Sequence, residues 1–246
     1  MDKIVSLKNI FKRELPSDPH QLIKEISSII DHTNLKPEAT LKDLESTCRE
    51  AVEHGFYACC IPNFYVENIA KQFAGQVKIA TVAGFPHGNM ASTVKVKEVE
   101  TAYVNGADEV DVVANISLFK SGLYSQAIEE VERILDISKS YGGVLKVIIE
   151  TGYFSEAEIY RITRELSNIG VHYVKTSTGF GPRGATPEDV LILKKAVQGT
   201  ATKVKAAGGI RTGLQALLFY LLGVDRIGTS SSIKIVKDLE ASFNVE

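Results

Sequence analysis

The sequence predicts an α/β protein folded as a TIM (β/α)8 barrel with an extra N-terminal helix. Short apolar runs alternate with longer amphipathic runs along the 246 residues, and there are eight such pairs. The short runs are mostly continuous rather than alternating, as in residues 144–149, which is typical of parallel strands covered by helices. Eight β-α units in a chain of this length match one barrel.

The strands are expected where apolar and β-branched residues cluster. They are residues 29–32, 57–61, 77–83, 109–114, 144–150, 171–176, 202–206 and 226–228. A helical pattern follows each of them, and an additional helix over residues 19–28 precedes the first. The eight helices are residues 41–54, 66–74, 92–105, 124–141, 156–169, 187–197, 213–222 and 233–243.

Periodicity and capping residues support the helices. In residues 156–169 the apolar side chains recur at three- and four-residue spacing, from Ile159 to Ile169. Ser155 can cap this helix, with Glu158 three residues further on as the second half of a capping box.

Other signals mark helix ends. Thr186 is a suitable N-cap, and Pro187 after it fits the first helical position. Six glycines stand where helices are expected to end, which suits a left-handed C-cap. They are Gly55, Gly106, Gly142, Gly170, Gly199 and Gly223.

A doubly wound open sheet is the alternative fold. It would need a glycine fingerprint after the first strand, and residues 31–35 supply none. No linker, low-complexity segment or charge block divides the chain, so we expect residues 1–246 to form one domain.

Charge and cysteine content exclude several classes of protein. A net charge of -2 provides no basic field for nucleic acid or an anionic membrane. No apolar stretch reaches 18 residues and the start has no signal-peptide core, so neither a membrane span nor secretion is expected. Cys48, Cys59 and Cys60 form neither a disulfide framework nor a CxxC zinc motif. We therefore expect a cytoplasmic protein that binds no metal and no cofactor.

Two lysines at the ends of neighbouring strands point to the chemistry. Lys175 ends the sixth expected strand and Lys205 lies near the end of the seventh, so both should face the mouth of the barrel. An ammonium beside a second ammonium loses its proton more easily. A lysine of pKa about 10.4 is almost wholly charged at pH 7, whereas one of pKa about 7 is half neutral. Neutral amines attack carbonyls, so the pair suggests Schiff-base catalysis.

Acidic residues within the strands complete this pattern. Asp111 lies between valines, and burying it unpaired would be costly, so we expect the two lysines to be its partners. Asp31 is in a similar position at the end of the first strand. Of the histidines, His87 follows the third strand and is a candidate to line the mouth.

Glycine-rich segments follow the last three strands. They are residues 177–179, 207–211 and 227–231, and the latter two include Arg211 and Ser230. Glycines allow backbone N–H groups to approach an anion, and phosphate sites after strands seven and eight are common in barrels. The sequence therefore predicts a phosphate site here.

Together these segments resemble the deoxyribose-phosphate aldolase family. The matching segments are residues 30–33, 35–40, 82–88, 106–113, 146–152, 174–181, 204–212 and 226–231, which extend over nearly the whole chain. The resemblance implies a class I aldolase that reversibly cleaves 2-deoxy-D-ribose 5-phosphate to D-glyceraldehyde 3-phosphate and acetaldehyde. It also implies a homo-oligomer, a dimer or a tetramer, whose partners are small molecules.

The resemblance further implies roles for individual residues. Lys175 matches the Schiff-base lysine, Lys205 the lysine that lowers its pKa, and Asp111 the acid that transfers protons through an ordered water. Asp31 and Lys146 match supporting polar residues. The remaining matches are a frequent cysteine without a required role and the phosphate loops: Cys60, Gly179, Gly208, Gly209, Arg211, Ser230 and Ser231.

Four departures from the family pattern stand out. Asn34 replaces leucine beside Asp31, Arg183 replaces a glycine, and Ser232 replaces a glycine after the last phosphate loop. The sequence has no tyrosine in its last residues, 244–246, whereas some members have a tail whose tyrosine assists proton transfer. Two alternatives stay open: a phosphosugar-binding barrel without lyase activity, and a Schiff-base aldolase for another phosphorylated sugar.

Overall fold

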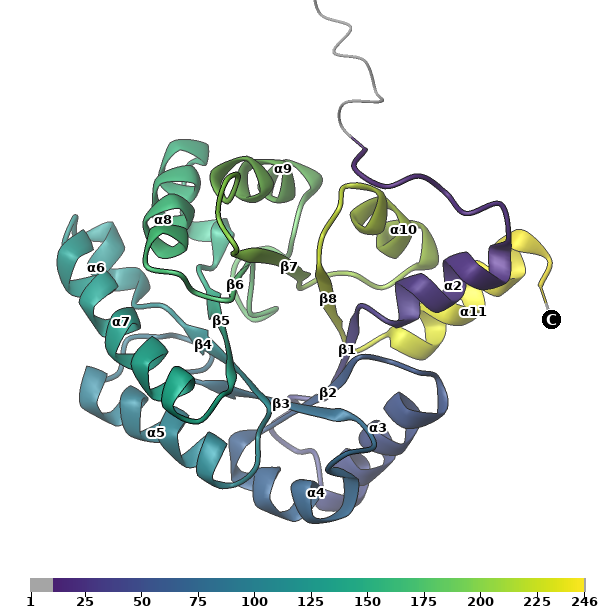
Figure 1. Ribbon diagram of the computed structural model, residues 1–246, viewed down its shortest axis with the longest axis horizontal. Helices are drawn as coiled ribbons and strands as arrows, with labels where there is room; N and C mark the ends of the chain where they lie inside the picture. The colour runs from purple at the N-terminus through teal and green to yellow at the C-terminus, as the bar shows by residue number, and fades with distance from the viewer. Residues whose placement is uncertain (1–10, 246) are drawn as a thin grey trace, which may run out of the picture.

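The computed structural model describes residues 11–245, which form a closed barrel of eight parallel strands surrounded by helices (Figure 1). The strands are β1 Ile30–Thr33, β2 Ala58–Ile61, β3 Lys78–Ala83, β4 Glu109–Val113, β5 Val144–Ile148, β6 Tyr173–Lys175, β7 Lys203–Ala207 and β8 Arg226–Thr229. Each strand pairs with the next, and β8 pairs with β1, where Asp31 is the partner of Gly228. This closure confirms the TIM barrel and excludes the open sheet.

Most helices lie where the sequence predicted them, with ends that differ by one residue. They are α2 Pro19–Ser27, α3 Leu41–Glu53, α4 Val66–Phe73, α5 Ser92–Val104, α6 Ile116–Lys120, α7 Tyr124–Ser140, α8 Glu156–Asn168, α9 Pro187–Ala196, α10 Gly213–Leu221 and α11 Ser232–Phe243, with 3-10 turns η1 Asn63–Tyr65 and η2 Thr151–Tyr153. The additional helix α2 packs beside α11 (Figure 1).

The predicted capping residues have the expected geometry. Ser155 and Glu158 form a reciprocal capping box at the start of α8, and Thr186 forms one with Asp189 at the start of α9. The six glycines predicted to end helices all have positive φ. Short α6 was not predicted, because five residues are too few to show helical periodicity; the Asn115 side chain caps it by accepting from an α6 backbone N–H.

The interior of the barrel is unusually polar. Apolar side chains fill the space between the strands and the helices, as in most barrels. Inside the barrel, a small apolar cluster of Ala58, Cys60, Ala80 and Val82 occupies the β2–β3 side. Buried charged side chains from β1 and β4–β8 occupy the rest, which identifies the lumen as the place to search for chemistry.

No helix within residues 11–245 combines the length and the apolar character needed to cross a bilayer.

Candidate active site

Strand register brings the predicted lysines and acid together. The Cα atoms of Lys175 and Lys205 are direct partners across β6 and β7, and Asp111 is the partner of Lys146 across β4 and β5. Side chains of neighbouring parallel strands at the same level point to the same face. All four therefore project into the lumen and are almost completely buried.

Asp111 lies at the centre of the cluster. Its Oδ2 accepts hydrogen bonds from Lys175 Nζ and Lys205 Nζ, each at 2.7 Å. Its Oδ1 accepts from Lys146 Nζ, also at 2.7 Å. The predicted ion pairing of Asp111 with the two lysines is confirmed, and Lys146 adds a third cation.

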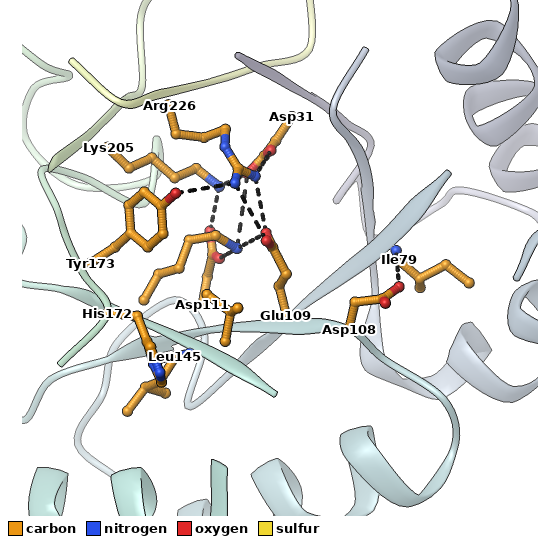
Figure 2. A network of polar contacts seen from close by, with 12 residues as sticks. Asp31, Ile79, Asp108, Glu109, Asp111, Leu145, His172, Tyr173, Lys205 and Arg226 are labelled. Atoms are coloured by element: carbon orange, nitrogen blue, oxygen red, sulfur yellow. Dashed lines mark hydrogen bonds and ion pairs between the residues drawn. The ribbon is translucent and has the colours of Figure 1, made fainter. Parts of the chain in front are cut away.

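A second group of charges, from Arg226, Asp31 and Glu109, lies next to Asp111 (Figure 2). Arg226 Nη1 contacts Asp31 Oδ1 at 2.7 Å and Glu109 Oε2 at 3.0 Å. Lys146 Nζ lies 2.6 Å from the same Glu109 oxygen, and Lys205 contacts Asp31. The two groups therefore form one continuous network.

Sequence analysis missed Arg226 and Glu109 as members of the site. Arg226 is fully enclosed: its guanidinium stacks 3.3 Å from the centroid of the Tyr57 ring, and it donates to the Tyr173 hydroxyl at 3.3 Å. An arginine at the first position of a short buried strand is the signal that could have identified it, because β8 has room for few inward side chains.

Burial and neighbouring charges set the protonation of the cluster. Burial lowers the pKa of Lys175 and Lys205 lowers it further, while Asp111 opposes both. Burial disfavours ionised Asp111, but Lys146, Lys175 and Lys205 outweigh it and hold the pKa of that carboxyl well below its usual range. Asp31 is similar, since Lys205 and Arg226 overcome its burial and lower its pKa to about 2.

The predicted effect of Lys205 on Lys175 is confirmed in direction, since Lys205 lowers the pKa of Lys175. Burial, which the sequence interpretation did not include, lowers this pKa more. The two ammonium groups are bridged by the shared oxygen of Asp111, so they do not face each other unscreened. For Lys205, Asp111 and Asp31 outweigh burial and raise the pKa.

A cavity of about 570 Å³ opens above Lys175. It is lined by Lys175 and by five of the six residues predicted to bind phosphate: Gly179, Gly208, Gly209, Arg211 and Ser230. The sixth, Ser231, is not among the described residues that line it; its backbone N–H donates to Thr229 Oγ1 within the turn. The predicted phosphate loops thus share one cavity with the lysine.

Two of the loop glycines are required by close packing. A Cβ atom at Gly184 would lie 2.2 Å from the carbonyl oxygen of Gly208, and Gly208 has φ +84°. The Ala185 N–H also donates to that oxygen, at 3.1 Å. The loops after β6 and β7 therefore approach each other backbone against backbone at Gly184 and Gly208.

Glu150 is a further residue that sequence analysis treated only as the end of a strand. It adopts a left-handed conformation, with φ 53°, two residues after the end of β5. Its Oε2 accepts hydrogen bonds from the Thr178 N–H, at 3.1 Å, and from the Thr178 hydroxyl. Glu150 thus fixes the loop that follows Lys175 and contains Gly179.

The residues that depart from the family pattern do not crowd the cluster. Asn34 donates to Thr47 Oγ1 at 3.3 Å, which directs its amide toward α3. Arg183 is paired with Asp189, so its charge is already satisfied.

Ser232 is fully buried, and its hydroxyl lies 2.9 Å from Nδ1 of His32. It therefore does not narrow the cavity.

His87 lines a second cavity at the same end of the barrel, of about 370 Å³, as expected for a residue at the mouth. Within residues 11–245, no three histidine, cysteine or acidic side chains are arranged to hold a metal ion.

Comparison with known proteins places these features in a family. A family model described as DeoC/LacD family aldolase matches residues 1–220. Deoxyribose-phosphate aldolase of Thermococcus gammatolerans is 45% identical over 217 residues, which cover 87% of this chain and 96% of that protein. The enzyme of the same name from Dictyoglomus turgidum is 44% identical over 217 residues, covering 87% and 97%.

Solved structures agree. A structure described as the unique tetrameric deoxyribose phosphate aldolase of Aeropyrum pernix superposes with a TM-score of 0.84 at 34% identity, covering 89% of this chain and 93% of that one. A putative deoxyribose-phosphate aldolase of Coccidioides immitis gives the same TM-score and identity, covering 92% and 87%. The chain belongs to the DeoC/LacD family of aldolases.

Proposed function

We propose that the protein is a deoxyribose-phosphate aldolase that reversibly cleaves 2-deoxy-D-ribose 5-phosphate to D-glyceraldehyde 3-phosphate and acetaldehyde. One observation carries this assignment: a buried lysine amine with a lowered pKa opens into a cavity lined by the glycine-rich loops. Phosphate bound at Gly179, Gly208, Gly209, Arg211 and Ser230 would hold the far end of the sugar and direct its aldehyde toward Lys175.

In the proposed reaction the neutral amine of Lys175 adds to the C1 carbonyl and water is lost, which forms a protonated imine. A base removes the proton of the C3 hydroxyl, the C2–C3 bond breaks, and its electron pair enters the imine as an enamine. Glyceraldehyde 3-phosphate leaves, C2 is protonated, and water releases acetaldehyde from Lys175.

Asp111 and Lys205 are the groups we propose for these proton transfers, with a water between Asp111 and the substrate. Both contact the Lys175 amine or its carboxylate partner, and both are held by further charges. Lys146 and Asp31 support them by keeping Asp111 ionised and Lys205 charged.

Cys60 faces the same lumen, but burial raises the pKa of its thiol to about 11, so it stays neutral and needs no role in the reaction.

Borohydride trapping with acetaldehyde and peptide mass mapping tests the assignment. We expect an ethyl adduct on Lys175 that is absent in Lys175→Ala. Lys203→Ala is the matched control, because Lys203 is an exposed lysine at the start of β7, and it should leave the adduct unchanged. An adduct on another lysine would contradict the residue assignment.

A substrate panel separates the alternatives. Cleavage of another phosphorylated sugar in preference to deoxyribose 5-phosphate would favour a different Schiff-base aldolase. Binding of the phosphosugar without any adduct would favour a non-catalytic barrel.

We further propose that the protein acts in the cytoplasm and assembles into a dimer or a tetramer. Its three cysteines, Cys48, Cys59 and Cys60, are free and buried, which suits a reducing compartment. The Aeropyrum pernix relative is described as tetrameric. Light scattering of the purified protein measures the assembly, and a monomer at micromolar concentration would contradict it.

A further inference from the structure

The buried network contains unequal numbers of positive and negative groups. Among the described residues, four cationic side chains are joined to three carboxylates by contacts of 3.4 Å or less. The cations are Lys146, Lys175, Lys205 and Arg226, and the carboxylates are Asp31, Glu109 and Asp111. With every group ionised, the network has one positive charge in excess, and a buried unmatched charge is unfavourable. Loss of one proton makes the network neutral.

The contacts identify which group loses this proton. Arginine does not deprotonate in proteins, and Arg226 contacts both Asp31 and Glu109. Lys146 lies between Glu109 and Asp111, and Lys205 contacts Asp31 and Asp111.

Within residues 11–245, Asp111 is the one carboxylate that contacts Lys175. The excess charge therefore falls on Lys175, the lysine that opens into the cavity.

Arg226 and Glu109 lie away from the reacting atoms. Neither is among the described residues that line the cavity above Lys175. Arg226 is stacked on Tyr57, which directly precedes β2 and is 41% exposed, so this end of the network closes the barrel floor. Any influence on the reaction must be transmitted through the charged side chains between this floor and Lys175, which are Asp31, Lys146, Lys205 and Asp111.

We propose that Arg226 and Glu109 are positioning residues of opposite sign that set the charge balance of the network and thereby the protonation of Lys175, with Arg226 disfavouring the protonated amine and Glu109 favouring it. Arg226 supplies the fourth positive charge, which makes the network exceed neutrality by one. Glu109 limits the excess to one by pairing with Arg226 and Lys146. This inference rests on the proposed function only for its catalytic meaning, because the protonation of Lys175 can be measured without turnover.

The groups that face Lys175 come from most of the barrel. Asp111 of β4 and Lys205 of β7 face it directly, and Cys60 of β2 faces it as a neutral thiol. Asp31 of β1 and Lys146 of β5 lie behind these, next to Arg226. The β3 strand contributes the apolar side chains of Ala80 and Val82.

Competitive labelling with trace acetic anhydride tests this inference. The acetylation rate of Lys175, read by peptide mass spectrometry from pH 5 to 10 against N-acetyl-lysine in the same tube, reports the pKa of the amine. Arg226→Met should raise this pKa by about one unit, a tenfold loss of neutral amine at pH 7, and Glu109→Gln should lower it by a similar amount. Arg226→Lys keeps the charge and should restore the wild-type profile.

Arg164→Met is the matched control, since Arg164 donates to backbone carbonyls between α8 and α9 outside the barrel, and it should shift nothing. An unchanged profile in both Arg226→Met and Glu109→Gln, or a shift of the same sign in both, would overturn the inference. If Arg226→Met fails to fold, Glu109→Gln alone tests the inference. A lowered pKa of Lys175 in that variant supports it, and an unchanged or raised pKa overturns it.

Acetaldehyde trapping on the wild-type protein is scored separately. Labelling shifts of opposite sign without an ethyl adduct would support the charge balance and reject the proposed function. An ethyl adduct without labelling shifts would support the proposed function and reject the charge balance.

Discussion

Replacing Lys205 by methionine should move the pH dependence of the aldolase upward. Lys175 Nζ and Lys205 Nζ each lie 2.7 Å from the same Asp111 oxygen, so the two nitrogens are at most about 5.4 Å apart. At an effective dielectric constant of about 20, two positive charges at that distance repel by about 3 kcal/mol. Removing this repulsion raises the pKa of Lys175 by about 2 units and lowers the neutral fraction at pH 7 about 100-fold.

The assay is kcat/KM for deoxyribose 5-phosphate cleavage between pH 5 and 10. The acid limb reports the lysine of the free enzyme, and it should lie about 2 pH units higher in Lys205→Met. The ratio of wild-type to variant kcat/KM should therefore be largest below pH 7. Toward pH 10 it should fall to the constant factor that reflects the loss of Lys205 as a proton-transfer group. Lys203→Met, an exposed lysine of the same strand, should keep the wild-type profile.

A loss of activity that is the same at every pH would refute the electrostatic reasoning. It would mean that Lys205 acts only by transferring protons or by shaping the site, and that its repulsion of the Lys175 ammonium does not set the pKa of Lys175.

Three predictions concern stability. Gly88→Ala should lower the free energy of unfolding in urea by about 2–4 kcal/mol, because Gly88 has φ +70° and the new Cβ would lie 2.1 Å from a carbonyl oxygen. Gly142→Ala is the control, since Gly142 has a similar φ but open space around it, and it should cost about 1 kcal/mol. Equal losses in the two variants would contradict the steric explanation. Lys95→Met should lower the free energy of unfolding by about 3–5 kcal/mol, since it leaves Glu130 buried without its cation. The double variant Lys95→Met with Glu130→Leu should recover most of that loss. If it recovers none, the buried ion pair is not the cause. Burial lowers the pKa of His32 below its ordinary value of 6.5, so its contribution to stability is complete above that value and is lost as the pH falls toward the native pKa. The free energy of unfolding should therefore decrease from pH 7 to 5, and it should decrease less steeply in His32→Gln.

The positions of the strands and the central residues of the candidate site could be predicted from the sequence. Lys175, Lys205 and Asp111 each lie in an apolar run, and parallel strands in consecutive order bring such positions to one lumen. Helix ends were predictable because the N-capping side chains and the C-terminal glycines lie within a few residues of the helix ends that they define.

Arg226 could not be predicted in the same way. Its partner Asp31 is 195 residues away in sequence, and the two meet only because β8 closes against β1. Glu150 was extrapolated as strand, since its left-handed conformation depends on its bonds to Thr178, which come from the next strand's loop. A local signal can mark such a residue as buried, but its partner depends on barrel closure or on a neighbouring loop and cannot be predicted from nearby sequence.

The backbone contact between Gly184 and Gly208 has a consequence for redesign of the substrate range. No side chain can be introduced at position 184 without displacing Gly208, which lines the cavity, so this part of the cavity wall offers no room for variation. The segment between β1 and α3 lines the same cavity with the side chains of Asn34, Leu35 and Lys36. Libraries that seek new acceptor aldehydes should vary these three positions and leave the glycines unchanged.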